Sequence, residues 1–147
     1  MEFDVLKLEN QLCFPLYASA KEVVKKYKPF LDEIGLTYTQ YIAIMVLWEK
    51  KTVNVKELGE CLYLDSGTLT PLLKKMEQQG LVTRERSKVD ERNLIVTITL
   101  HGESLRKRAM KIPEQMHGCI NLTPEEAKIL YKLLYKILGQ IGGGTCE

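Results

Sequence analysis

A cysteine near the start of the chain is the residue best suited to chemistry. Cys13 lies in the apolar segment 12–17, LCFPLY. A thiol is a strong nucleophile only as the thiolate, and hydrogen-bond donors near the sulfur favour that form. Pro15 lacks a backbone N–H, so a helix here must kink or begin, and a helix start would place free N–H groups near the sulfur. The alternative is a buried cysteine that acts as a small hydrophobic side chain, which is its commoner role in helices.

Composition limits the classes of protein that can carry this thiol. The chain has 147 residues, 45% hydrophobic and 27% charged, which predicts one globular domain with a core. The first residues lack the basic and apolar regions of a secretory signal, and no apolar run approaches the roughly 18 residues that span a bilayer. We therefore expect a cytoplasmic protein with no membrane partner. The net charge of +2 neither requires nor excludes nucleic acid.

The N-terminal third is predicted to form two helices. Apolar residues recur near helical spacing from Phe3 to about Tyr27, which predicts a long amphipathic helix interrupted by Pro15. Pro29 and the residues up to 35 are breakers. Thr37 then offers a polar N-cap before an apolar run that is long enough for a buried second helix.

Two short helices follow and make a helix-turn-helix. Residues 55–62 place apolar side chains on one face, and Asp65 begins a polar cap. Apolar residues then recur at i, i+3, i+4 and i+7 until Gly80: Leu69, Leu72, Leu73 and Met76. Two helices joined by a tight polar turn are typical of the helix-turn-helix motif.

The period changes after Gly80. Residues 81–86 and 93–100 alternate around a charged turn, which predicts a β-hairpin. Apolar spacing over 105–116 marks another helix. Thr123 and Glu126 form a capping box before a final helix with a broad apolar stripe.

The order of elements predicts a mainly α fold with a small β-hairpin, a winged helix-turn-helix. We expect a single domain over residues 1–141, with DNA binding at about 55–100, dimerisation helices at about 1–35 and 101–141, and a flexible tail at 142–147. The final stripe is wider than one contact face needs, so a second copy would cover it. In such a homodimer, two recognition helices enter successive major grooves of double-stranded operator DNA.

Polar and basic side chains on the second helix of the motif and on the hairpin are candidate DNA contacts. Hydroxyl and amino groups on the helix face away from its apolar positions and can reach phosphates and base edges. On the hairpin, Asp90 can pair with Arg92 and hold its guanidinium at the tip for the minor groove. The alternative for the hairpin is an ordinary solvated ribbon, because acidic residues nearly offset its cations. The candidates are Ser66, Thr68, Thr70, Lys74, Lys75, Arg84, Arg86, Asp90 and Arg92.

The chain resembles the MarR family of dimeric winged-helix regulators, and within it the organic-hydroperoxide-sensing OhrR branch. The resemblance covers nearly the whole chain up to about residue 140. The winged-helix part rests on DSGTLTPLLKKME at 65–77, GLV at 80–82 and DER at 90–92; the branch rests on NQLCF at 10–14, YKP at 27–29 and LTYTQY at 36–41.

The resemblance implies roles for several residues. The cysteine matching Cys13 is the peroxide-reactive one, and tyrosines matching Tyr27 and Tyr38 hydrogen-bond it across the dimer interface. The positions matching Ser66, Thr68, Thr70, Arg84, Asp90 and Arg92 lie at the DNA surface. Cys119 falls where two-cysteine members keep a resolving cysteine, although it is equally well an incidental loop thiol. The expected function is a repressor that is released from its operator when an organic hydroperoxide oxidises Cys13, without a cofactor.

Other classes of function make different demands. A thiol peroxidase would use the same chemistry with turnover, but it has no reason to carry a winged helix. A MarR-type regulator released by a non-oxidant ligand would still respond without Cys13. A metal sensor is disfavoured, because His101 and His117 lack companions at ligand spacing. We therefore expect neither an enzyme nor a metal site.

Overall fold

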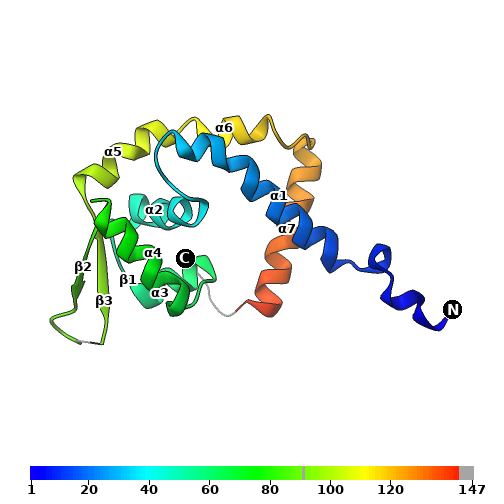
Figure 1. Cartoon of the computed structure of the whole chain (residues 1–147), viewed down its shortest axis with the longest axis horizontal. Helices are drawn as coiled ribbons and strands as arrows, with labels where there is room; N and C mark the ends of the chain where they lie inside the picture. Colours follow the sequence, from blue (N-terminus) through cyan, green and yellow to red (C-terminus); the bar gives the residue numbers. More distant parts are fainter. Residues whose placement is uncertain (91, 143–147) are drawn as a thin grey trace.

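The computed structural model describes residues 1–90 and 92–142 and shows helices arranged around a small antiparallel sheet (Figure 1). In chain order the elements are η1 (Glu2–Leu6), η2 (Leu8–Asn10), α1 (Cys13–Asp32), α2 (Tyr38–Lys50), β1 (Thr52–Asn54), α3 (Val55–Leu62), α4 (Ser66–Gln78), β2 (Val82–Arg86), β3 (Leu94–Ile98), α5 (Leu100–Ala109), α6 (Ile112–His117) and α7 (Pro124–Ile141). The helix-turn-helix of α3 and α4 and the wing of β2 and β3 lie at one end of the molecule. The N-terminal turns project from the other end.

The sheet has three strands rather than the two of the predicted hairpin. Its order is β1-β3-β2, all antiparallel, with Val82 opposite Ile98 in the wing and Val53 opposite Val96 on the other side of β3. Strand β1 was not predicted, because three residues are too few to show an alternating period. The extra strand fixes β3 to the helical body and leaves the wing tip free.

The first helix begins and ends later than predicted. Residues 2–10 form two short 3-10 turns, and α1 runs from Cys13 to Asp32. Pro15 is the third residue of α1, where a backbone N–H has no partner within the helix, so the helix begins near it rather than kinking. Pro29 was predicted to break the helix, but α1 continues past it to Asp32. Leu31, two residues after Pro29, is almost fully buried in the core.

The predicted helix over 105–116 is two helices. The helix is interrupted between Ala109 and Ile112, and Pro113 occupies the first turn of α6. In a continuous helix the ring of Pro113 would clash with the carbonyl of Ala109, so the break has a steric cause. The predicted capping box at Thr123 is present, and it begins α7.

The hydrophobic core joins α2, the helix-turn-helix and the sheet. Leu47, Leu58, Leu73 and Val96 are fully buried at its centre. Gly59 allows α3 and α4 to approach, since a Cβ there would lie 2.7 Å from the carbonyl oxygen of Leu64. The core therefore fixes the recognition helix α4 to both α2 and the wing.

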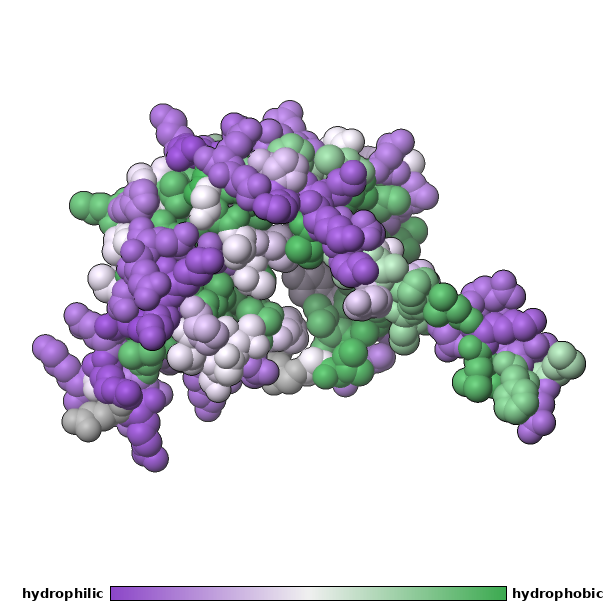
Figure 2. Space-filling model, viewed as in Figure 1, coloured by the Kyte–Doolittle hydropathy of each residue, from purple (hydrophilic) through white to green (hydrophobic). Residues whose placement is uncertain are grey.

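The terminal elements carry apolar side chains that this core does not cover. No described residue of α7 is buried, and large apolar side chains are exposed on it and on the N-terminal segment. Figure 2 shows hydrophobic residues along the N-terminal projection and hydrophilic residues over the wing. No helix within residues 1–90 and 92–142 has the length and hydropathy needed to cross a membrane. Of the predicted flexible tail, residues 143–147 lie outside the described residues.

Candidate nucleic-acid interface and cysteine site

The N-terminus of α4 presents a capped and exposed first turn. The carboxylate of Asp65 accepts a hydrogen bond from the backbone N–H of Thr68 at 2.7 Å. The backbone N–H and hydroxyl of Thr68, followed by the N–H of Gly67, hold the pKa of this carboxyl below its ordinary value of 3.8. The cap orients the helix so that Ser66, Thr68 and Thr70 are exposed while Leu69 is buried.

The exposed face of α4 fits a duplex chemically. The hydroxyl of Thr70 donates to the carbonyl of Ser66 at 2.8 Å, which leaves its lone pairs free to accept. Lys74 and Lys75 continue the exposed face toward the end of the helix. The N-terminus of a helix also attracts a phosphate through its free N–H groups and its partial positive charge.

Exposed cations lie at the wing tip, among them Arg92 and Lys88. The carboxylate of Asp90 accepts from the backbone N–H of Arg92 at 3.0 Å and from its Nε at 3.4 Å. The side chain of Arg92 is 92% exposed. Its near neighbour Glu91 lies outside the described residues. Arg86 is exposed further down the wing, on β2.

Arg84 is placed differently from the other basic candidates. Its Nη2 and its backbone N–H both donate to the carboxylate of Glu77, each at 3.2 Å, and its side chain is only 20% exposed. The guanidinium thus joins α4 to β2. Arg84 was predicted as a DNA contact, and its ion pair with Glu77 was not predicted.

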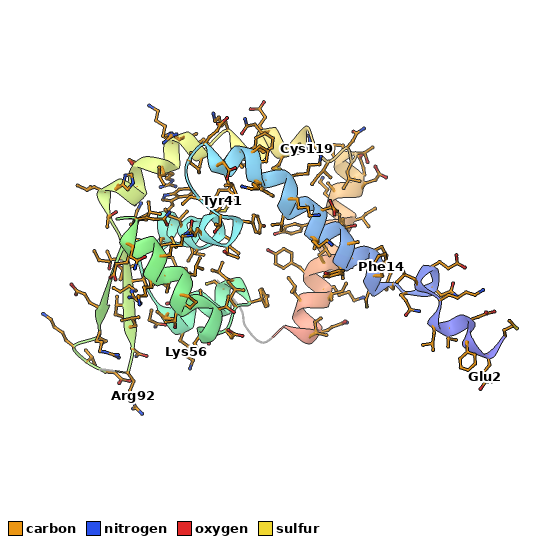
Figure 3. All side chains as sticks on the ribbon, in the orientation of Figure 1. Glu2, Phe14, Tyr41, Lys56, Arg92 and Cys119 are labelled. Atoms are coloured by element: carbon orange, nitrogen blue, oxygen red, sulfur yellow. The ribbon has the colours of Figure 1, made fainter. Side chains whose placement is uncertain are left out.

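A cleft of about 740 Å³ brings the two halves of the predicted DNA surface together. Ser66 and Thr70 of α4 line it beside Arg92 of the wing and Lys56 of α3. Figure 3 shows Lys56 and Arg92 at the same end of the molecule. Lys56 was not among the predicted contacts; its position in the first turn of α3, the helix before the recognition helix, was the available signal.

Cys13 is exposed at the first residue of α1. The free N–H groups of that turn point toward the N-terminal end of the helix, where the side chain lies. Leu8, Phe14 and Pro15, together with polar residues of the N-terminal turns, line an open surface depression beside the start of α1. The thiol is therefore accessible and has apolar neighbours.

The two predicted partner tyrosines lie together, but far from this thiol. The rings of Tyr27 and Tyr38 are 4.9 Å apart, and Tyr41 lies 5.8 Å from Tyr27. Burial raises the pKa of each phenol, and the neighbouring phenols add to the shift for Tyr27, so all three remain protonated donors at neutral pH. Cys13 and Tyr27 are fourteen residues apart on α1, which is about 21 Å along a helix. One chain does not bring the thiol to the phenols.

Cys119 is also exposed. It follows α6, and its thiol donates to the carbonyl of Gln115 at 3.6 Å. Figure 3 places it where α6 leads to α7, apart from Phe14 at the start of α1. The two exposed cysteines therefore do not meet within one chain. Among residues 1–90 and 92–142 no group of three or more His, Cys, Asp and Glu side chains is arranged to hold a metal ion.

Comparisons with known proteins agree with a winged-helix regulator. Residues 25–109 match the family described as transcriptional regulator SarA/Rot. The organic hydroperoxide resistance transcriptional regulator of Bacillus subtilis is 53% identical over 137 residues, 93% of each chain. AbfR of Staphylococcus epidermidis, solved bound to DNA in reduced and in overoxidized form, is 35% identical with a TM-score of 0.76, and the match covers 96% of this chain and 99% of that one. The chain belongs to the MarR/SarA-type winged-helix transcriptional regulators, in the branch of the organic hydroperoxide resistance regulators.

Proposed function

We propose that this chain is a redox-sensing repressor that binds operator DNA as a homodimer in the cytoplasm and is released when an organic hydroperoxide oxidises Cys13. The observation that carries the proposal is an exposed cysteine at the first residue of a long helix, in a chain that also carries a winged helix. The matched relatives are transcriptional regulators rather than enzymes, so the chemistry serves sensing rather than turnover.

DNA binding uses the capped face of α4 and the wing. Ser66, Thr68 and Thr70 contact phosphates and base edges from the first turns of α4 in the major groove, and Arg92 enters the minor groove. The remaining candidates supply phosphate contacts: Lys74, Lys75, Arg86 and, added from the cleft, Lys56. Arg84 contributes to DNA binding indirectly, because its ion pair with Glu77 holds β2 against α4.

A second copy covers the exposed apolar faces. The exposed large apolar residues of α7 and the N-terminal segment form more surface than a small monomer usually leaves uncovered. A two-fold axis through these elements sets two α4 helices about 34 Å apart, the spacing of successive major grooves.

The same second copy completes the sensing site. Because about 21 Å of helix separates Cys13 from Tyr27, the phenols that donate to the sulfur are those of the partner subunit. A phenol is protonated at neutral pH, and burial raises the pKa of Tyr27 and Tyr38 further, so both are available as donors. Phenol donors stabilise a sulfur anion, so they favour the reactive form of the thiol.

The reaction is a two-electron oxidation of the sulfur. The Cys13 thiolate attacks the distal oxygen of the hydroperoxide, the O–O bond breaks, and the alkoxide takes a proton and leaves as an alcohol. The sulfur becomes a sulfenic acid, which condenses with a second thiol to give a disulfide and water. That thiol is Cys119 of the other subunit in a two-cysteine switch, or a low-molecular-weight thiol in a one-cysteine switch. A structure of AbfR in a disulfide form exists, at 34% identity and a TM-score of 0.64.

Release follows from geometry. Oxidised sulfur no longer accepts the same hydrogen bonds from the phenols, so the helices that carry them shift relative to the other subunit. Since both half-sites must be met together, a displacement of a few Å loses phosphate contacts on at least one of them.

The test compares wild type, Cys13→Ser and Cys119→Ser. A duplex selected by the reduced wild-type protein from a random-sequence pool serves as the operator, and binding is measured before and after one equivalent of an alkyl hydroperoxide. We expect wild type to lose affinity and Cys13→Ser to keep it. Loss of the response in both variants indicates a two-cysteine switch, and loss in Cys13→Ser alone a one-cysteine switch. If Cys13→Ser is released like wild type, the proposal is wrong.

A further inference from the structure

One buried polar side chain connects α2, which carries Tyr38, to the recognition helix α4. Gln40 is 1% exposed, and it is the fully buried polar residue of the described core. Its Oε1 accepts from the backbone N–H of Thr37 at 3.0 Å, which closes the capping box of α2. Its Nε2 donates to Oε1 of Gln79 at 3.0 Å. Both ends of the amide are therefore used.

Gln79 lies at the other end of this contact, on the C-terminal cap of α4. Its own amide reaches the carbonyl of Gly35 at 3.5 Å. Gln79 thus ties the end of the recognition helix to the loop before α2 as well as to α2 itself. The tie spans 39 residues of sequence.

Gln40 lies in the same helical turn of α2 as Tyr38, so its contact with Gln79 connects Tyr38 to the end of α4. Tyr38, whose phenol we assign to the sensing site, lies two residues earlier in the same helical turn, and its ring packs on Tyr27. A movement of Tyr38 must move the first turn of α2, because the capping box with Thr37 holds that turn together. The first turn of α2 therefore has the sensing phenol on one side and the end of α4 on the other.

A buried amide transmits such a movement rather than absorbing it. If Gln40 moved while α4 stayed, its N–H would lose its acceptor inside the core, and an unsatisfied buried donor is costly. Following the movement keeps the hydrogen bond and displaces the end of α4. The second aromatic route from this cluster, Tyr41 to Trp48, ends instead on the carbonyl of Gly102 in α5.

We propose that Gln40 and Gln79 are positioning residues that couple α2, which carries the phenol of Tyr38, to the recognition helix α4. This inference rests on the proposed function, because the signal that it transmits is the oxidation of Cys13. The bond holds α4 in its DNA-binding orientation in the reduced protein and carries the shift of α2 to α4 after oxidation.

The test measures the ratio of the operator Kd of the oxidised protein to that of the reduced protein. Gln79 is exposed, so Gln79→Ala removes the acceptor without opening a cavity in the core. Gln79→Glu restores an acceptor at the same position. Gln78→Ala, one residue earlier and also exposed, is the matched control. Mass spectrometry of the peptide that contains Cys13 confirms that this residue is oxidised to the same extent in every protein.

The expected result is a selective loss of coupling. For wild type we expect a ratio within the range of about 5 to 150 that allosteric coupling usually spans. Gln79→Ala should lower this ratio about fivefold, the equilibrium factor of one hydrogen bond. Gln79→Glu and Gln78→Ala should keep the wild-type ratio.

Two results would overturn the inference, and they are distinguishable. A Gln79→Ala protein that is oxidised at Cys13 and keeps the wild-type ratio shows that the coupling runs elsewhere, while the proposed function stands. A wild-type ratio of one, with Cys13 fully oxidised, refutes the proposed function and the coupling together.

Discussion

Glu77→Gln tests whether the ion pair between α4 and β2 sets the angle of the wing. The carboxylate of Glu77 holds both the guanidinium and the backbone N–H of Arg84 at 3.2 Å. The side chain of Glu77 is 40% exposed and that of Arg84 is 20% exposed. The pair is therefore neither a free surface contact nor a buried one, and it joins the recognition helix to the first strand of the wing.

The expected cost lies between two known limits. Exposed ion pairs contribute about 0–1 kcal/mol, and hydrogen bonds to charged groups about 1.5–3 kcal/mol. A glutamine keeps one acceptor oxygen but loses the charge, so we expect Glu77→Gln to lower the free energy of unfolding by about 1 kcal/mol. That corresponds to a fall in Tm of about 2–4 °C for a domain of this size. If the wing must be held for binding, the same 1 kcal/mol weakens operator binding about fivefold.

The assay separates this effect from simple electrostatics. Glu77→Gln raises the net charge by one unit, which alone would strengthen binding to DNA. Glu85→Gln makes the same change on an exposed side chain of β2 and is the matched control. Fluorescence anisotropy with the selected duplex at one salt concentration, and thermal melts by circular dichroism, compare the two. If Glu77→Gln binds the duplex as tightly as Glu85→Gln and has the same Tm as wild type, the ion pair does not hold the wing.

Three further changes test the packing and the cap. Gly102→Ala would place a Cβ against the carbonyl of Leu81, so we expect an overpacking cost of about 1–3 kcal/mol in urea unfolding. Leu73→Ala, at a fully buried site, should cost about 2–5 kcal/mol in the same assay. Asp65→Asn keeps a cap but does not titrate. Since the folded pKa of Asp65 is lowered, its ionic contribution is present above pH 3.8 and is lost as the pH falls through the folded pKa, so the Tm advantage of wild type at pH 7 should shrink as the pH falls below 3.8.

Each of these has a result that would contradict it. Leu100 is 90% exposed, and Leu100→Ala should leave the unfolding free energy nearly unchanged; an equal loss in both leucine variants would show that burial is not the cause. An unchanged midpoint for Gly102→Ala would mean that the backbone at Leu81 moves aside at little cost. A Tm difference between Asp65 and Asn that stays constant from pH 7 to pH 3 would remove the charge of the cap as a source of stability.

Local patterns predicted most of the fold. The caps at Thr37, Asp65 and Thr123 begin helices as expected, because an N-cap and the apolar period depend on residues within about one turn. The same locality explains the errors. Over residues 3–12 an apolar period was present, but neither of the 3-10 turns in this segment has a buried residue, so the core does not hold a helix there. Strand β1 exists only through its pairing with β3, more than forty residues away.

The sequence by itself determined the family, the winged helix-turn-helix and the candidate redox cysteine, because motifs and periods depend on residues that are close together in the chain. Only the tertiary structure decided which distant side chains meet. It packed Tyr27 on Tyr38, joined Gln40 to Gln79, and placed Cys13 at the far end of α1 from the phenols. Such contacts depend on how whole helix faces pack around a common core, and that packing sums many small terms over residues far apart in the chain.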